Sequence, residues 1–133
     1  MKYRDLNLVT DYNELVKLWG KSPMGIAPSE DMLSPFGVVV YDEDGIIHGA
    51  IFNFYILATE MVLIGYPIVD FDLPKEERKK LFPKLLEKAE KLAWDSNCVL
   101  AQSYSGELHM TESMLKQGWI TGDKNVTHLM KLL

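Results

Sequence analysis

The segment from Ile46 to Leu57 carries apolar side chains on both faces of a β-strand, and this feature most constrains the fold. One face would hold Ile46, Ala50, Phe52, Phe54 and Ile56, and the other Ile47, Ile51, Tyr55 and Leu57. A strand that is apolar on both faces must be covered from both sides. We therefore expect an α/β fold with a mixed central sheet and helices on both faces.

Two further strands are expected beside this one. Phe36 to Tyr41 and Gly45 to Ala58 flank a turn at Asp42–Gly45, where the Asp-Gly pair tolerates the positive φ of a tight hairpin. A third strand is expected from Glu60 to Val69. The three segments predict an antiparallel centre for the sheet.

The N-terminal third predicts a strand, a helix and a loop. Tyr3 to Val9 can form the strand, and Asp11 can cap a helix that Gly20 ends. The apolar positions of this helix recur at helical spacing: Tyr12, Leu15, Val16 and Trp19. Lys21 to Pro35, with three prolines and a glycine, reads as a loop with one brief helical turn.

The C-terminal half predicts two helices, a strand and a hairpin. Because proline suits the first position of a helix, we expect the long helix after Pro74 to start at Pro83. Cys98 to Tyr104 reads as a strand, and Leu108 to Gln117 as a helix ended by Gly118. The closing hairpin is expected from these segments: Trp119–Thr121 and Asn125–Lys131.

Composition bounds the class of protein. A chain of 133 residues, 47% hydrophobic and 25% charged, fits one globular domain over residues 1–133. The net charge of −5 argues against nonspecific nucleic-acid binding, and no apolar run reaches the ~20 residues that span a bilayer. The N-terminus lacks a signal-peptide pattern, and Cys98 has no partner for an internal disulfide. We expect a cytoplasmic protein.

The order of elements resembles that of the GNAT superfamily of acyl-coenzyme A-dependent N-acyltransferases. Asp44 to Ile51 resembles the family's second hairpin, with an early glycine in the strand. Ile68-Val69, then Pro74, then Leu85-Leu86 resembles its fourth strand, coenzyme loop and third helix. Lys116 to Trp119 resembles its glycine–aromatic step. The resemblance spans the chain and implies acetyl-CoA as cofactor.

The coenzyme loop departs from the family pattern. Glu77 stands where an arginine or glutamine is usual, and Lys80 and Phe82 replace glycines that let amides approach a pyrophosphate. The resemblance implies pantetheine pairing along Ile68 and Val69. Phosphate binding would then fall to a nest formed by Lys79, Lys80 and Leu81 and to the cations Arg78, Lys79, Lys80 and Lys84. The alternative is that the charged run is simply a solvated turn.

The residues expected to transfer protons also depart from the family pattern. Met114 occupies the position where many members have a tyrosine acid, and Glu107 one where asparagine is common. Tyr104 or Tyr66 could supply the acid instead, and Glu60 or Asp70 the base, with Tyr104 and Glu60 our first choices. Each of these residues also has a purely structural interpretation.

The three histidines lie apart and have no ligand-spaced partners, so we expect no metal site. His48 and His128 read as hydrogen-bonded structural residues within strands.

Two hypotheses follow. The first is an acetyl-CoA-dependent N-acyltransferase acting on a primary amine of a small molecule or protein, without nucleic-acid or membrane partners and compatible with a homodimer. Substrate contacts would come from Lys21 to Pro35. The second is a GNAT-fold module without catalysis, as small GNAT-like proteins of some tailed phages suggest. In either case we expect the ring of Phe82 to pack inward on Leu85 and Leu86 rather than to fill the phosphate pocket.

Overall fold

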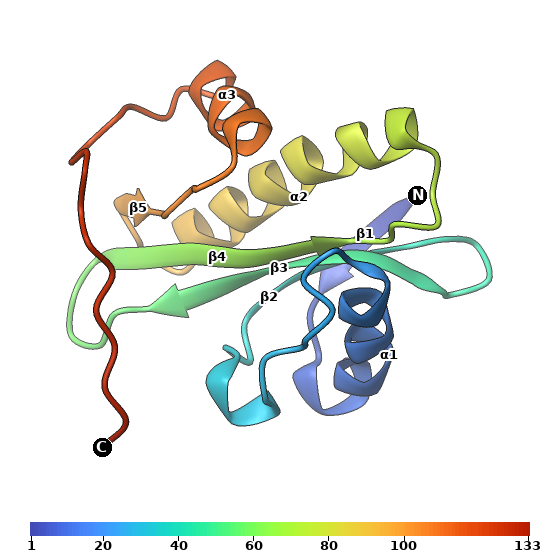
Figure 1. Ribbon diagram of the computed structural model, residues 1–133. Helices are drawn as coiled ribbons and strands as arrows, with labels where there is room; N and C mark the ends of the chain where they lie inside the picture. The colour runs from blue at the N-terminus through green and yellow to red at the C-terminus, as the bar shows by residue number, and fades with distance from the viewer.

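The strand that is apolar on both faces lies at the centre of a five-stranded sheet, between two helical layers (Figure 1). The computed structural model describes residues 1–133. The strands are β1 (Lys2–Asp5), β2 (Gly37–Tyr41), β3 (Ile47–Tyr55), β4 (Met61–Val69) and β5 (Leu100–Gln102), in the spatial order of the sequence. All neighbours pair antiparallel except β4 and β5, which are parallel. The expected mixed sheet is confirmed.

The helices are α1 (Leu8–Lys21), α2 (Lys75–Asp95) and α3 (Leu108–Lys116), with a short 3-10 turn, η1 (Glu30–Met32). Helix α1 covers one face of the sheet and α2 the other, while α3 lies beside α2 (Figure 1). The core therefore has two halves. The α1 half includes Leu15, Trp19 and Phe52, and the α2 half includes Ile51, Leu85 and Leu86, all buried.

A break in register changes the face of one β3 residue. Ile47 was expected on the same face as Ile51, yet it is buried in the α1 half of the core with Ala50 and Phe52. The pairing of β2 with β3 shifts between Val40 and Tyr41, so the strict alternation of side chains fails there.

The first helix starts earlier than expected. Asn7 caps α1 by accepting a hydrogen bond from the amide of Thr10, so the opening strand ends at Asp5 and not Val9. Asp11, the expected cap, lies instead in the first turn. It is buried and accepts two 2.9 Å hydrogen bonds from the Arg4 guanidinium, which joins β1 to α1.

The second helix also starts earlier, at Lys75 rather than Pro83, so Pro83 lies inside α2. The amides of Glu77 and Arg78 both donate to the carbonyl of Pro74 and close the first turn. The sequence between Pro74 and Pro83 consists largely of Lys, Glu and Arg, which are strong helix formers. Phe82 is half-buried and packs against the α2 half of the core, which confirms the expected inward packing of its ring.

The chain after β5 matches the expectation only in part. Helix α3 forms and ends before Gly118, whose φ of +92° suits glycine. The closing hairpin does not form: residues 119–133 contain no strand and pass the end of the sheet (Figure 1). His128 is exposed there, not in a strand. None of the helices combines the length and apolar character needed to cross a membrane.

Candidate acyl-coenzyme site

The outer edge of β4 is open over its second half. Strand β5 pairs only with Met61 to Leu63, and the hydroxyl of Ser103 then donates to the carbonyl of Ile64. Beyond that point β5 has ended, and the chain rises to α3 (Figure 1). Backbone groups on the outer side of residues 65–69 therefore have no neighbouring strand. A free strand edge of this kind can pair with an extended, amide-bearing ligand.

The two residues expected to contact pantetheine differ in orientation. The amide of Asp70 donates to the carbonyl of His48 across the β3–β4 ladder at 2.8 Å. Because amides alternate between the two sides of a strand, the amide and carbonyl of Val69 face the open edge. Those of Ile68 then face β3, and its side chain is buried in the core. Val69 is thus the residue of the pair that can offer hydrogen bonds.

A bulge bends β4 where the edge opens. Tyr66 and Pro67 lie opposite the single residue Ile51, because the register shifts between Ala50 and Phe52. Tyr66 has a φ of +50°, which is uncommon for a residue with a side chain. Bulges of this kind bend a strand and redirect its side chains.

The cations expected to bind phosphate all lie on α2, but not at its start. Lys79, Lys80 and Leu81 belong to the second turn, where each amide bonds to the carbonyl four residues back. The expected nest of amides is therefore wrong, and Leu81 is a buried core residue. Only the amides of Lys75 and Glu76 are left free by the first turn.

Among these cations, Arg78 has the most distinctive environment. Its guanidinium lies 4.7 Å from the ring centroid of Phe71, in the loop that follows β4, and it makes no ion pair. Its Nε is buried without a hydrogen-bond partner. By contrast, Lys79 pairs with Glu76, and Lys84 pairs with Glu87. Arg78 and Lys80 are thus the two expected cations without an ion pair, and of these Arg78 is the one packed against a ring of the loop that follows β4.

The candidate acid and base lie at different places along β4. Tyr104 is exposed and comes directly after Ser103, at the fork where β5 leaves β4. Glu60 precedes β4 at its other end, where its carbonyl accepts from Val99 and Leu100. Six residues separate Glu60 from Tyr66, or roughly 20 Å of strand. The structure brings Tyr104 to the open edge, but it does not bring Glu60 there.

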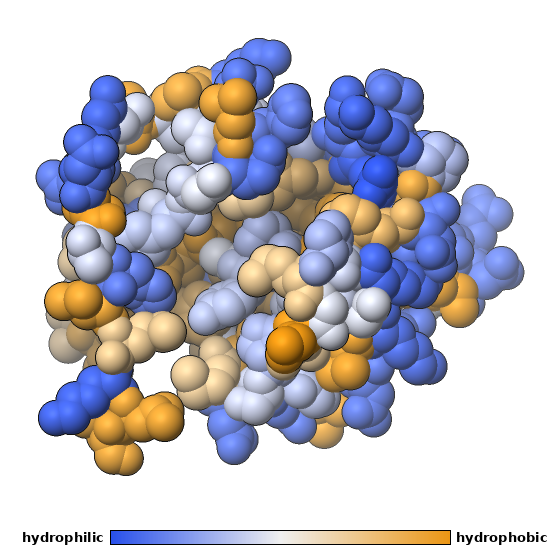
Figure 2. Space-filling model, in the orientation of Figure 1, coloured by the Kyte–Doolittle hydropathy of each residue, from blue (hydrophilic) through white to orange (hydrophobic).

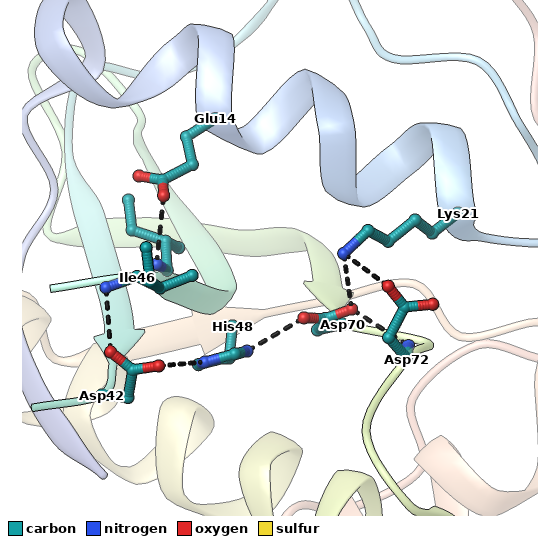
Figure 3. Close-up of polar contacts among 8 residues, drawn as sticks. Glu14, Lys21, Asp42, Ile46, His48, Asp70 and Asp72 are labelled. Carbon is teal, nitrogen blue, oxygen red and sulfur yellow. Dashed lines mark hydrogen bonds and ion pairs between the residues drawn. The ribbon is translucent and has the colours of Figure 1, made fainter. Parts of the chain in front are cut away.

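A polar network that the sequence did not reveal holds the end of β4 (Figure 3). His48, from β3, lies between two carboxylates: its Nδ1 is 2.9 Å from Asp70 and its Nε2 is 2.8 Å from Asp42. Lys21, the last residue of α1, contacts Asp70 at 3.2 Å and Asp72 at 2.8 Å. We call these five residues the His48 network. It joins the β2–β3 hairpin, α1 and the β4–α2 loop.

The contacts within the His48 network stabilise the charged forms of His48, Asp42 and Asp70. Burial by itself would lower the pKa of His48, but the hydrogen bonds to Asp42 and Asp70 outweigh it and raise that pKa above its ordinary value. Burial would raise the pKa of Asp70, but the Asp72 amide, His48 and Lys21 outweigh it and lower that pKa. The hydrogen bond from His48, followed by the Ile46 amide, lowers the pKa of Asp42. An imidazole with both nitrogens bonded to carboxylates is a poor proton acceptor, so the network positions the loop rather than moving protons.

Asp70, the alternative base, is committed to this network and is 4% exposed. The expectation that His48 is a hydrogen-bonded structural histidine is confirmed. Its partners were not predicted, because Asp70 is 22 residues away in sequence and comes close only through β3–β4 pairing. No group of three or more His, Cys, Asp or Glu side chains is arranged to hold a metal ion.

The sheet with its forked β4–β5 pair and the bulged fourth strand defines a GNAT fold. An acetyltransferase from Trypanosoma brucei superposes with a TM-score of 0.67 at 14% identity, over 97% of this chain and 99% of the other. Glucosamine-6-phosphate N-acetyltransferase from Arabidopsis thaliana gives 0.67 at 13% identity, over 98% of each chain. Aminoglycoside 6′-N-acetyltransferase from Acinetobacter haemolyticus gives 0.63 at 14% identity, over 100% and 99%.

Each of these superpositions covers nearly the whole of both chains, so the likeness in fold extends over nearly the full length of this protein. No protein-family model and no curated protein matches the sequence. At identities this low the likeness concerns the fold, and the chemistry must be argued from the residues of this chain.

Proposed function

We propose that the chain is an N-acyltransferase that moves an acetyl group from acetyl-CoA to a primary amine. The observation that carries this proposal is the open edge of β4, with Tyr104 at the fork and Arg78 beyond its other end. The acetyltransferase activity of its structural neighbours supports it.

The residues present fit the coenzyme in two respects. The outward amide and carbonyl of Val69 suit the amide-rich pantetheine arm. The Arg78 guanidinium, which lies against the Phe71 ring and makes no ion pair, suits a phosphate. Lys80, two residues further along α2, is exposed and adds positive charge to this end of the helix. The amide nest is absent, so side chains must provide the phosphate contacts.

When bound, acetyl-CoA supplies a thioester whose carbonyl carbon the amine attacks. A carbon–nitrogen bond forms and the carbon–sulfur bond breaks. Tyr104 would give its phenolic proton to the departing sulfur. Glu60, our first choice of base, precedes β4 at the end away from the open edge and is too far to act even through one water, so the proton that the amine loses would pass to solvent. Asp70 is unsuited to the role of base because its lowered pKa makes it a weak base and because Lys21 and His48 occupy its oxygens.

The acceptor remains an amine of a small molecule or protein. The loop from Lys21 to Pro35 carries exposed apolar side chains, Met24, Ile26 and Met32. The face of the molecule in Figure 2 is hollowed between the C-terminal segment and the middle of the molecule. A chain of net charge −5 attracts a cationic amine. We place the activity in the cytoplasm, where the single thiol Cys98 stays reduced.

Release of free coenzyme thiol, followed with a panel of amines, tests this proposal. Tyr104→Phe should lower kcat by about 10²-fold or more, because the leaving sulfur loses its proton donor. Tyr66→Phe is the matched control, since it removes the other exposed hydroxyl near the fork, and it should leave kcat unchanged. Loss of activity in the Tyr66 variant alone would assign the acid to Tyr66 and contradict our choice.

A second candidate, a GNAT-fold module without catalysis, is favoured by one observation. Helix α2 continues through the segment where family members place the coenzyme loop, so the amides of that segment are used within the helix. A folded chain that neither binds acetyl-CoA nor releases thiol with any amine would favour this candidate.

A further inference from the structure

The segment that follows β4 is fixed on both sides of Phe71. The amide of Asp70 donates to the carbonyl of His48 at 2.8 Å, and the carbonyl of Asp70 accepts from the amide of Leu73 at 3.2 Å. The Asp70 carboxylate also accepts from the amide of Asp72 at 3.0 Å. Because the backbone is held immediately before and after Phe71, the direction in which its side chain leaves the backbone is set.

Lys21, at the end of α1, reaches across this segment. Its ammonium contacts Asp70 at 3.2 Å and Asp72 at 2.8 Å (Figure 3). His48 contacts Asp70 from β3 at 2.9 Å. The Asp70 side chain is only 5% exposed, so its contacts are partly shielded from water and salt. The His48 network therefore fixes the two residues that flank Phe71.

The ring of Phe71 in turn orients Arg78. The Arg78 guanidinium lies 4.7 Å from the centroid of the ring. An aromatic ring attracts a cation without neutralising its charge, and Arg78 makes no ion pair, so that charge remains for a ligand. A free arginine side chain loses rotamer freedom when it binds a phosphate, and one that already lies against a ring loses less.

The position of this pair relative to the open edge favours the coenzyme as the ligand. Phe71 follows Val69 by two residues, and Val69 presents its amide and carbonyl to the open edge. An acyl group at the fork and pantetheine along residues 65–69 would bring the phosphates to the loop that carries Phe71. Arg78 lies at this end of the strand.

We propose that Phe71 is a positioning residue for the coenzyme: its ring, fixed by the His48 network, keeps Arg78 in place for a phosphate group. Phe71 acts through Arg78 and touches no reacting atom. The inference rests on the proposed function, because it assigns a role within the same coenzyme site.

Isothermal titration of the full chain and two variants with acetyl-CoA tests the role of the ring. Phe71→Leu keeps an apolar side chain without the ring, and it should bind about threefold to fivefold more weakly. Phe71→Tyr keeps the ring and should bind as the unchanged chain does. Phe71 is 37% exposed, so both variants should fold, which their melting temperatures check. Unaltered binding by Phe71→Leu, or an equal loss in Phe71→Tyr, would overturn the proposal.

A double variant separates an effect through Arg78 from a merely structural one. If the ring acts through Arg78, adding Phe71→Leu to Arg78→Ala should leave the loss at the value of about tenfold that Arg78→Ala causes alone. A ring that acts independently would multiply the two losses to roughly thirtyfold or more. Such a product would overturn the proposal.

Lys21→Met tests the support that the His48 network gives to the ring. It removes both contacts of the ammonium with the loop and should weaken binding about threefold. Lys17→Met is the matched control, because Lys17 is exposed one turn earlier on α1 and makes no ion pair. Equal affinities of these two variants would overturn the role of the network.

The same titrations separate failure of this inference from failure of the proposed function. A folded, unchanged chain that binds no acetyl-CoA would contradict both. An unchanged chain that binds acetyl-CoA with an affinity insensitive to Phe71→Leu would contradict this inference alone.

Discussion

Replacing His48 with glutamine should destabilise the protein by an amount that depends on pH. The charged imidazole donates a hydrogen bond to each of two carboxylates, Asp42 and Asp70. Hydrogen bonds to charged groups contribute about 1.5–3 kcal/mol each. A glutamine amide in this place can serve only one of them, and Asp70 is almost fully buried. We therefore expect a loss of about 2–4 kcal/mol at about pH 6.

The sign of the pH dependence follows from the raised pKa of His48. Its folded-state pKa lies above the ordinary value of 6.5, so its stabilising contribution is fully present below pH 6.5. That contribution is lost as the pH rises through the folded-state pKa. A neutral imidazole donates from one nitrogen only, so at about pH 9 the cost of His48→Gln should fall to about 1–2 kcal/mol.

Urea denaturation of both proteins at the two pH values measures this difference. The matched control is His109→Gln, because the His109 side chain is 81% exposed on α3. Its effect on the free energy of unfolding should be small at both pH values. A cost of His48→Gln that is the same at both values, or larger at high pH, would refute the assignment of a doubly bonded, charged His48.

Two further predictions concern packing. Phe82→Gly should lower the melting temperature, because it removes a ring packed on the core and adds a flexible residue to a helix, and it should not raise acetyl-CoA affinity; tighter binding with unchanged melting would place the ring in the phosphate pocket. Gly37→Ala should destabilise the protein by about 1–3 kcal/mol, because its Cβ would clash with the carbonyl oxygen of Ile51. Gly65→Ala, whose Cβ would have nothing within 4 Å, should cost little. Equal unfolding free energies for the two variants would contradict the close approach of β2 and β3.

The fold could be predicted where the signal was local. Asp44-Gly45 marked the hairpin, and Gly45 indeed has a φ of +81°. The apolar character of β3 on both faces required helices on both sides, and α1 and α2 supply them. Gly118 marked the end of α3. In each case the physical cause lies within a few residues of the signal.

The predicted helix boundaries were wrong where two local sequence signals competed. Pro83 is a good first residue for a helix, but the preceding Lys, Glu and Arg residues have high helix propensity and form two turns before it. Asn7 and Asp11 can both act as caps, and Asp11 is instead held by Arg4. Which of two plausible residues acts is decided by tertiary contacts that a sequence does not display.

The site was harder to predict than the fold. Tyr104 could be placed at the end of a strand, but its position at the fork depends on how few residues of β5 pair with β4. Arg78 appeared as one of several similar cations, and only its packing on Phe71 separates it from Lys79 and Lys84. Long-range pairing and packing determine these differences, so the sequence could suggest the set of residues but not the members that act.

Isothermal titration of the full chain with acetyl-CoA tests the central claim most directly. The open edge of β4 and the Arg78 guanidinium, which makes no ion pair, predict binding with a micromolar Kd, weakened by about tenfold in Arg78→Ala. Lys91→Ala is the control, because Lys91 pairs with Asp95 at the far end of α2, and it should bind as the unchanged chain does. A folded chain that gives no heat at high micromolar coenzyme would contradict the claim.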